Sequence, residues 1–188
     1  MPTQISHGCS RLKTVGWSYT GRVMSDYVTT HGAGRLAGIN FVDASIKGIP
    51  GFVGDNLKNF APMMPEDLAT NINGTRAFLR ACFELQPSAE DFEIMLSFNM
   101  MVPPKVRAGL ARRPLDATAV MQKLQIPVLV THGGLDKNSK LGNSQYTAST
   151  IPGAKLSVYK GIGHAPFYED AARFNAELTA FVRDANRK

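Results

Sequence analysis

The chain has 188 residues, of which 44% are hydrophobic, and these values fit one folded globular domain and exclude a disordered polypeptide. Its net charge of +6 arises from scattered Lys and Arg residues; apart from Arg112-Arg113 they form no basic cluster with interleaved aromatics, which argues against nucleic-acid binding. The N-terminal sequence lacks the apolar segment of a signal peptide, and no stretch approaches the roughly 18 apolar residues of a membrane helix. We therefore predict a cytoplasmic protein that binds neither nucleic acid nor a membrane.

The first predicted elements are a strand, a sharp turn and a helix. Residues 13–17 form a short β-prone run that breaks at Ser18-Tyr19-Thr20-Gly21. A helical stretch follows from Arg22 to Thr30 and is closed by Gly32 and Gly34.

Three further buried strands are expected at Leu36–Val42, Pro127–Thr131 and Lys155–Lys160, with a helix at Asn143–Thr150 between the last two. The final segment, Pro166–Ala185, is expected to form one helix that packs on a sheet face, because it carries an apolar stripe: Phe167, Ala171, Phe174, Leu178, Phe181 and Val182. Strands that alternate with helices predict an α/β fold with a doubly wound, mostly parallel sheet of about four strands.

The middle of the chain, Lys47 to Lys123, differs in character, since it is rich in Met and Phe and its helical patterns are broken by prolines. We predict a helical insertion here. Ser88 followed three residues later by Asp91 indicates a helix start that resembles a capping box. The Met and Phe side chains fit either a helix core or the lining of a ligand pocket.

A near match to the nucleophile elbow lies at Gly16-Trp17-Ser18-Tyr19-Thr20, where a serine would sit on a strained turn between strand and helix. Small residues are needed two positions on either side of that serine, and Thr20 takes the place of the usual glycine. We expect Thr20 to crowd the turn, at a cost on the order of 1 to 2 kcal/mol. By itself the motif also fits a serine that caps a helix, so both interpretations stay open.

Two more residues follow predicted strands in the same way. Asp136 lies in the turn after residues 127–131, and His164 lies just after the last strand. All three residues therefore stand at the carboxyl ends of parallel strands, in the chain order Ser, Asp, His. Such a triad lets His164 take the proton of Ser18 while Asp136 orients the imidazole. Asp43, at the end of the second strand, is an alternative acid.

Five segments carry a resemblance to bacterial α/β-hydrolases of the group related to cofactor-free haloperoxidases and esterases: VGWSYTGRVMSDYV, RLAGINFVDAS, VPPKVRAGLARRPLD, PVLVTHGGLD and IPGAKLSVYKGIGHAPFYEDAARFNAELTAFV. The resemblance implies Ser18 as nucleophile, Asp136 as acid, His164 as base and the Tyr19 backbone N–H as one oxyanion donor. It also implies that residues 47–123 are a cap that shapes the acyl pocket.

The chain departs from the family at its start. Members of the family carry several strands and an oxyanion loop ahead of the elbow, whereas Ser18 is already the eighteenth residue here. His7-Gly8 and His132-Gly133-Gly134 imitate that loop but stand at unsuitable places. We therefore predict one incomplete domain over residues 1–188, with the nucleophile strand at an exposed sheet edge through which the chain self-associates.

Cys9 and Cys82 lie far apart and match neither a metal-ligand spacing nor a disulfide framework. This pattern fits a reducing compartment better than a secreted fold held by disulfides. We predict that both are unreactive thiols and that the protein uses no metal.

The predicted function is hydrolysis of a carboxylic ester or similar acyl substrate through an acyl-serine intermediate, without an organic cofactor. Activity is expected to be weak or lost, since one oxyanion donor has no candidate. Apolar residues in the insertion suggest an apolar small-molecule acyl substrate: Phe60, Met63, Phe92, Met95 and Phe98. The same triad could form a peracid from a carboxylic acid and peroxide as a side reaction. The alternative is a non-catalytic fragment stabilised by self-association or a partner.

Overall fold

The computed structural model describes residues 11–185 and contains a sheet of four parallel strands in the order β1-β2-β3-β4. The strands are β1 (Leu12–Trp17), β2 (Leu36–Val42), β3 (Val128–Gly133) and β4 (Lys155–Tyr159). The register places Trp17 beside Val42 and His132 beside Val158. Each strand lies within two residues of its predicted position, so the predicted parallel α/β sheet is confirmed.

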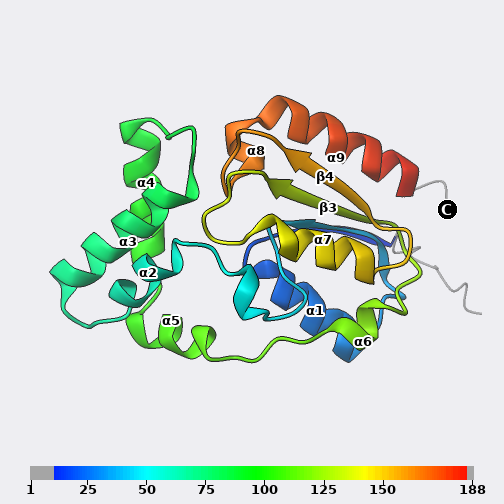
Figure 1. Ribbon diagram of the computed structural model, residues 1–188, viewed down its shortest axis with the longest axis horizontal. Helices are drawn as coiled ribbons and strands as arrows, with labels where there is room; N and C mark the ends of the chain where they lie inside the picture. Colours follow the sequence, from blue (N-terminus) through cyan, green and yellow to red (C-terminus); the bar gives the residue numbers. More distant parts are fainter. Residues whose placement is uncertain (1–10, 186–188) are drawn as a thin grey trace, which may run out of the picture.

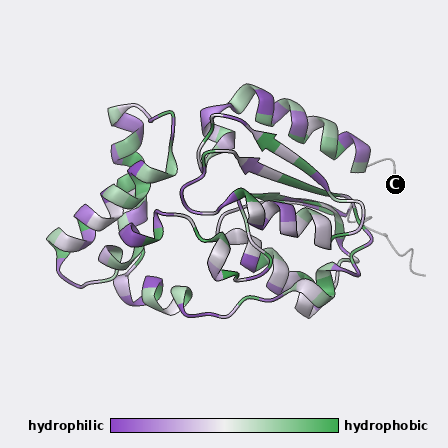
Figure 2. Cartoon of the chain, in the orientation of Figure 1, coloured by the Kyte–Doolittle hydropathy of each residue, from purple (hydrophilic) through white to green (hydrophobic). Residues whose placement is uncertain are grey.

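Helices cover both faces of this sheet, as a doubly wound fold requires (Figure 1). One face carries α1 (Thr20–His31), α6 (Thr118–Met121) and α7 (Leu141–Thr150), and the other carries α9 (Ala171–Ala185). Hydrophobic residues gather in the strands, whereas α9 alternates between hydrophilic and hydrophobic bands (Figure 2). The sheet is therefore the middle layer, and its central strands β2 and β3 are buried throughout.

Two apolar clusters join these layers. The larger lies between the sheet and the α1, α6 and α7 helices and includes Met24, Val28, Ile39, Phe41, Met121, Val130 and Ile151. The smaller lies under α9 and consists of Val42, Tyr159, Ile162 and Phe174, with Trp17 and Leu178 packed against it. Trp17 therefore connects the end of β1 to the α9 side of the sheet.

The C-terminal segment forms two helices, not the one helix that we predicted. A short α8 (Pro166–Glu169) precedes α9, and Asp170 between them leaves the helical region with φ −137°. The side chain of Asp170 accepts a hydrogen bond from the Arg173 N–H, at 3.3 Å, and so begins the second helix. As a result Phe167 lies off the α9 stripe and packs against Trp17, with 5.0 Å between ring centroids.

The middle of the chain is helical, as predicted. Its helices between residues 57 and 111 lie beyond the carboxyl ends of the strands, whereas α6 packs on the sheet (Figure 1). Leu79 of α3 (Leu68–Cys82) packs with Phe92 and Leu96 of α4 (Ala89–Met100). The predicted start of α4 is confirmed, because Ser88 Oγ accepts the Asp91 N–H at 3.1 Å. The interpretation of residues 47–123 as a cap stays a prediction. The elements are η1 (Pro50–Phe52), α2 (Leu57–Phe60), η2 (Ala61–Met63), α3 (Leu68–Cys82), α4 (Ala89–Met100) and α5 (Pro104–Ala111).

The nucleophile strand β1 is an edge strand, as the sequence predicts. It pairs with β2 on one side and with no strand among residues 11–185 on the other. Val15 in its middle is 46% exposed, although the following strand β2 is buried throughout. Self-association through this edge stays a prediction.

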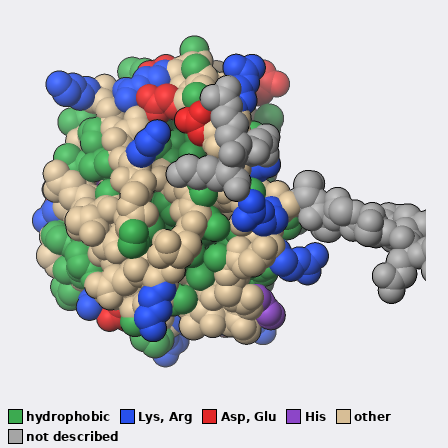
Figure 3. All heavy atoms as spheres, turned by 90° about the vertical axis from the view of Figure 1, so that its right-hand side faces the viewer, with side chains coloured by type: hydrophobic (Ala, Val, Ile, Leu, Met, Phe, Trp, Pro, Cys, Tyr) green, Lys and Arg blue, Asp and Glu red, His purple; other side chains and the backbone are tan. Residues whose placement is uncertain are grey.

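The surface shows dispersed positive charge. On the face in Figure 3, Lys and Arg side chains are spread among hydrophobic and polar groups. Within residues 11–185, no helix has both the length and the apolar character that crossing a membrane requires. The predictions of a cytoplasmic location and of no nucleic-acid or membrane partner remain predictions.

Candidate active site

Ser18 directly follows β1 and has a strained backbone. Its φ of 52° lies in the left-handed region, which a non-glycine residue rarely adopts. The Ser18 N–H donates to the Val42 carbonyl at 2.9 Å, so the turn is tied to the end of β2. The residue that precedes α1 is Tyr19, and no side chain within residues 11–185 caps this helix. The alternative interpretation of Ser18 as a helix cap is therefore wrong, and the turn has the form of a nucleophile elbow.

The close approach at this elbow falls at Gly16 and Gly21. A β-carbon on Gly16 would lie 2.2 Å from the Met24 Cε, and one on Gly21 would lie 2.7 Å from the Ala44 Cβ. Thr20, in contrast, is exposed. The prediction that Thr20 crowds the turn is wrong, because the contact between α1 and the segment after β2 comes one residue later.

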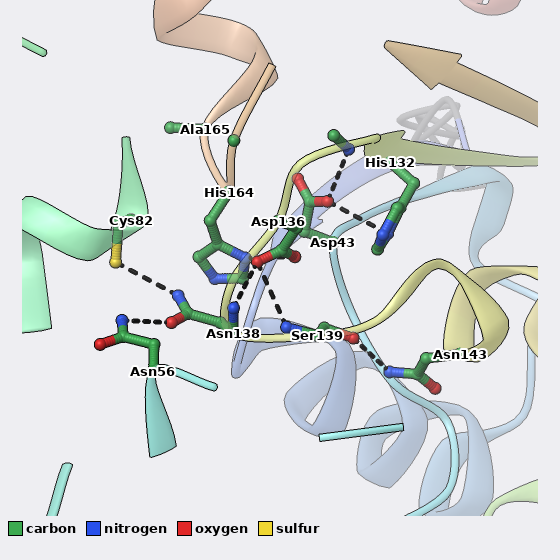
Figure 4. Close-up of polar contacts among 12 residues, drawn as sticks. Asp43, Asn56, Cys82, His132, Asp136, Asn138, Ser139, Asn143, His164 and Ala165 are labelled. Atoms are coloured by element: carbon green, nitrogen blue, oxygen red, sulfur yellow. Dashed lines mark hydrogen bonds and ion pairs between the residues drawn. The ribbon is translucent and has the colours of Figure 1, made fainter. Parts of the chain in front are cut away.

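Asp136 and His164 meet at the carboxyl end of the sheet (Figure 4). The Nδ1 atom of His164 lies 2.8 Å from Oδ2 of Asp136, and the side chain of Asp136 is fully buried. Its Oδ1 accepts backbone N–H groups from Asn138 at 2.7 Å and Ser139 at 3.2 Å. These bonds fix the carboxylate in one orientation, so the structure brings together the acid and base that the sequence predicts.

The other ring nitrogen of His164, Nε2, belongs to a side chain that lines two cavities. Nε2 is buried and has no hydrogen-bond partner in the described part of the chain. Ser18 and His164 line the same two cavities, of about 370 and 250 Å³. The larger also contains Tyr19 and a mostly apolar wall: Trp17, Phe78, Leu79, Cys82, Phe83, Met95, Phe98, Phe167 and Tyr168. This cavity has the size and lining of a small-ligand pocket.

Four hydrogen bonds that the sequence did not predict hold the loop of His164. The His164 N–H donates to the Cys82 carbonyl at 2.7 Å, and the His164 carbonyl accepts from the Trp17 indole at 2.6 Å. The carboxylate of Glu169 accepts the Gly163 N–H at 3.0 Å and the Glu84 N–H at 2.9 Å. The loop is thus fastened to β1, to the end of α3 and to α8. Of these residues, Trp17 alone had a local signal, its place next to Ser18.

The alternative acid, Asp43, lies beside the pair but bonds elsewhere. Its Oδ1 accepts the Gly133 N–H at 2.8 Å and lies 3.2 Å from Nδ1 of His132. Asp43 is buried, and its φ of 47° is the other positive value among the described non-glycine residues. Asp136, not Asp43, therefore bonds to His164.

The ionisable groups influence one another strongly. Burial alone would lower the pKa of His164, but the charge of Asp136 and its hydrogen bond outweigh this effect and raise the pKa. Burial would likewise raise the pKa of Asp136, yet the nearby His164 lowers it. Burial raises the pKa of Asp43 well above its ordinary value, and the negative charge of Asp136 adds to the rise. Burial lowers the pKa of His132. The site therefore favours a charged Asp136 and a neutral His132.

Asp43, Asp136 and His164 also present side-chain atoms within 4.8 Å of one another, a spacing that a cation could bridge. Within this group Asp136 and Nδ1 of His164 are joined by a hydrogen bond. The prediction of no metal and no cofactor remains a prediction.

The predicted oxyanion donor, the Tyr19 N–H, has no hydrogen-bond partner among residues 11–185. The loop mimic at residues 132–134 serves another purpose, since the Gly133 N–H donates to Asp43. The mimic His7-Gly8 and the thiol Cys9 lie outside the described residues. Cys82 is a free, buried thiol, and burial raises its pKa to about 12, so it is unreactive near neutral pH, as predicted.

No family model matches the sequence. A non-heme haloperoxidase from Rhodococcus erythropolis is 27% identical over 193 residues, covering 89% of this chain and 66% of the relative. The crystal structure of an esterase from Rhodococcus sp. ECU1013 is 30% identical with a TM-score of 0.87, over 94% of this chain and 66% of that one. A bromoperoxidase from Bacillus anthracis shares the fold, at 21% identity and a TM-score of 0.77, over 93% of this chain and 68% of the other.

The parallel sheet, the strained turn at Ser18 after β1, and the hydrogen-bonded Asp136 and His164 after β3 and β4 match the α/β-hydrolase fold. The chain therefore has the α/β-hydrolase fold, and its relatives and structural neighbours include esterases and non-heme haloperoxidases. It spans just under two thirds of the length of the first relatives it matches, 66% in both the R. erythropolis haloperoxidase and the Rhodococcus esterase.

Proposed function

We propose that this protein is a serine hydrolase that cleaves carboxylic esters through an acyl-serine intermediate. In the first step Ser18 Oγ attacks the ester carbonyl carbon while Nε2 of His164 takes the hydroxyl proton. The ester C–O bond then breaks, and the same proton passes to the departing alcohol. A water molecule repeats the sequence on the acyl-serine and releases the carboxylic acid. Asp136 keeps the imidazole in the tautomer that leaves Nε2 unprotonated.

One observation carries this proposal: the buried Nε2 of His164, which has no hydrogen-bond partner among residues 11–185, belongs to a ring that lines the same cavity as Ser18. Asp136 holds the ring through its other nitrogen, Nδ1, at 2.8 Å. A histidine with this arrangement is prepared to accept a proton from a group in the cavity. The aromatic wall of the cavity, including Phe78 and Phe98, favours an apolar acyl or alcohol group.

The same site supports a slow reaction in these 188 residues by themselves. The Tyr19 N–H can donate to the developing oxyanion, and the described residues offer no second donor that we can assign. Loss of one such donor costs about 10² to 10³ in turnover. We therefore expect weak esterase activity, and a peracid side reaction in which hydrogen peroxide takes the place of water.

An ester assay tests the proposal. The chain is incubated with p-nitrophenyl esters of increasing acyl length, together with the variants Ser18→Ala and His164→Ala. We expect slow release of p-nitrophenol that both variants abolish, with circular dichroism spectra like that of wild type. Equal release by wild type and Ser18→Ala would contradict the serine mechanism.

A second candidate is a non-catalytic chain that is stabilised by self-association, and the exposed edge of β1 favours it. We expect size-exclusion chromatography to show oligomers that Val15→Lys disrupts, because a charge on an edge strand opposes strand pairing. Lys155→Ala, a change on the exposed start of β4, is the matched control. A monomeric wild type would contradict pairing through this edge.

A further inference from the structure

Asp43 presents a carboxyl group whose two oxygens have different surroundings. Oδ1 accepts the Gly133 N–H at 2.8 Å and lies 3.2 Å from the His132 ring. Oδ2 is buried and has no hydrogen-bond partner among the described residues, and the side chain as a whole has no exposed surface. Burying a charged carboxylate oxygen without a hydrogen-bond donor costs free energy. The surroundings of Oδ2 therefore favour the neutral, protonated form of Asp43.

The neighbouring carboxylate of Asp136 indicates which protonation state Asp43 has. Figure 4 shows the Asp43 and Asp136 side chains next to each other, between His132 and His164. One carboxyl oxygen of each aspartate and one ring nitrogen of His164 lie within 4.8 Å of one another. Two adjacent buried carboxylates repel each other, and a proton on one turns that repulsion into a hydrogen bond. Asp136 already accepts two backbone N–H groups and faces Nδ1 of His164, so its negative charge is the better stabilised of the two.

We propose that Asp43 is a protonated carboxylic acid whose Oδ2–H donates a hydrogen bond to the Asp136 carboxylate. The proton is on Oδ2 because Oδ1 already receives the Gly133 N–H. Asp43 is thus a positioning residue: it holds Asp136 in place and limits how strongly Asp136 raises the basicity of His164. This effect on catalysis rests on the proposed serine mechanism, whereas the protonation state does not.

The backbone supports the same role. The Asp43 N–H donates to the Thr131 carbonyl at 2.9 Å, so the residue bridges the ends of β2 and β3. Its φ of 47° mirrors the strained φ of Ser18 at the end of the neighbouring strand. Strain of this kind persists where the surroundings hold a side chain in a required direction.

Three titratable groups lie against Asp43: His132 on β3, and Asp136 and His164 on the loops after β3 and β4. Cys82 on α3 interacts with Asp43 electrostatically. Because these groups also titrate, the protonation state of Asp43 has to be measured on its own carboxyl group. In a chain with ¹³C-labelled aspartate carboxyls, the Asp43 resonance is assigned with Asp43→Asn and followed against pH. We expect it to remain that of a carboxylic acid through neutral pH. Titration near the ordinary value of 3.8 would overturn the proposal.

The effect on His164 is measured by the rate at which a fluorophosphonate labels Ser18 as a function of pH. Asp43→Asn should keep the acid-limb midpoint of wild type, because a neutral amide donates to Asp136 as the acid does. Asp43→Ala should slow labelling by about 10- to 100-fold and move the midpoint to higher pH, because Asp136 loses a donor.

Two outcomes would overturn the proposal. A downward shift of the midpoint in Asp43→Asn would mean that Asp43 is ionised, and an unshifted midpoint in Asp43→Ala would mean that its proton points to His132. Absence of labelling in wild type would count against the proposed function, while the carboxyl resonance would still decide the protonation state.

Discussion

The indole N–H of Trp17 donates a hydrogen bond of 2.6 Å to the backbone carbonyl of His164. Trp17 is the last residue of β1 and precedes Ser18, so this bond joins the elbow to the loop of the base across the sheet. The two rings also pack, with centroids 5.4 Å apart. The relative position of Ser18 and His164 therefore depends on Trp17, which is not one of the three proposed catalytic residues.

Replacing Trp17 with Phe should lower the free energy of unfolding by about 1 to 3 kcal/mol, because the His164 carbonyl loses its donor while the apolar contact is mostly kept. Chemical denaturation measures this change. Tyr27→Phe, which removes a polar atom from α1 away from the site, is the control and should have little effect. Equal stability of Trp17→Phe and wild type would show that water replaces the indole at no cost.

Replacing Asp136 with Asn should reduce ester hydrolysis by about 10⁴-fold, since an amide favours the wrong imidazole tautomer. The kcat/KM for a short-chain ester measures this loss. Asp116→Asn, in an exposed ion pair with Lys47, is the control that should keep activity. If Asp136→Asn stays active and Asp43→Asn does not, Asp43 is the acid.

The pH dependence of kcat/KM should follow His164. As general base it works when neutral, so activity should rise as pH increases through its pKa. Because Asp136 raises that pKa, the midpoint of the acid limb should lie above the ordinary 6.5. A midpoint below 6.5 would mean that burial outweighs the carboxylate.

The tight contact of the elbow predicts a contrast between adjacent residues. Gly21→Ala should destabilise the fold by about 1 to 3 kcal/mol, because its β-carbon would meet Ala44 at 2.7 Å. Thr20→Ala, at an exposed position, should change the stability by no more than about 0.5 kcal/mol. Thermal unfolding of the two variants side by side decides this, and the reverse order would restore the original interpretation of Thr20.

The sequence predicts the sheet and the Asp136–His164 pair well for a physical reason. Buried parallel strands are continuous apolar runs, and polar residues just after them, such as Asp136 and His164, must come together at one edge of the sheet. The break at Asp170 was missed because the apolar stripe continues across it, and the break depends on where the Asp170 and Glu169 side chains bond.

The contacts that hold the site could not be predicted from the sequence. The carbonyl of Cys82 anchors the N–H of His164, and any residue type has a carbonyl, so no pattern reveals it. The proximity of Asp43 to Asp136 likewise depends on the register between β2 and β3. Such relationships come from packing between segments that are far apart in the chain.

The central claim, that Ser18 is activated by His164, is tested most directly by labelling with a fluorophosphonate followed by peptide mass spectrometry. Ser18 Oγ would displace fluoride and form a phosphonate ester, a reaction that needs the activated hydroxyl but no turnover. We predict one added phosphonyl group, on the peptide that contains Ser18, which is lost in Ser18→Ala and in His164→Ala. An unlabelled wild-type chain with a folded circular dichroism spectrum, or a label on any other residue, would contradict the account.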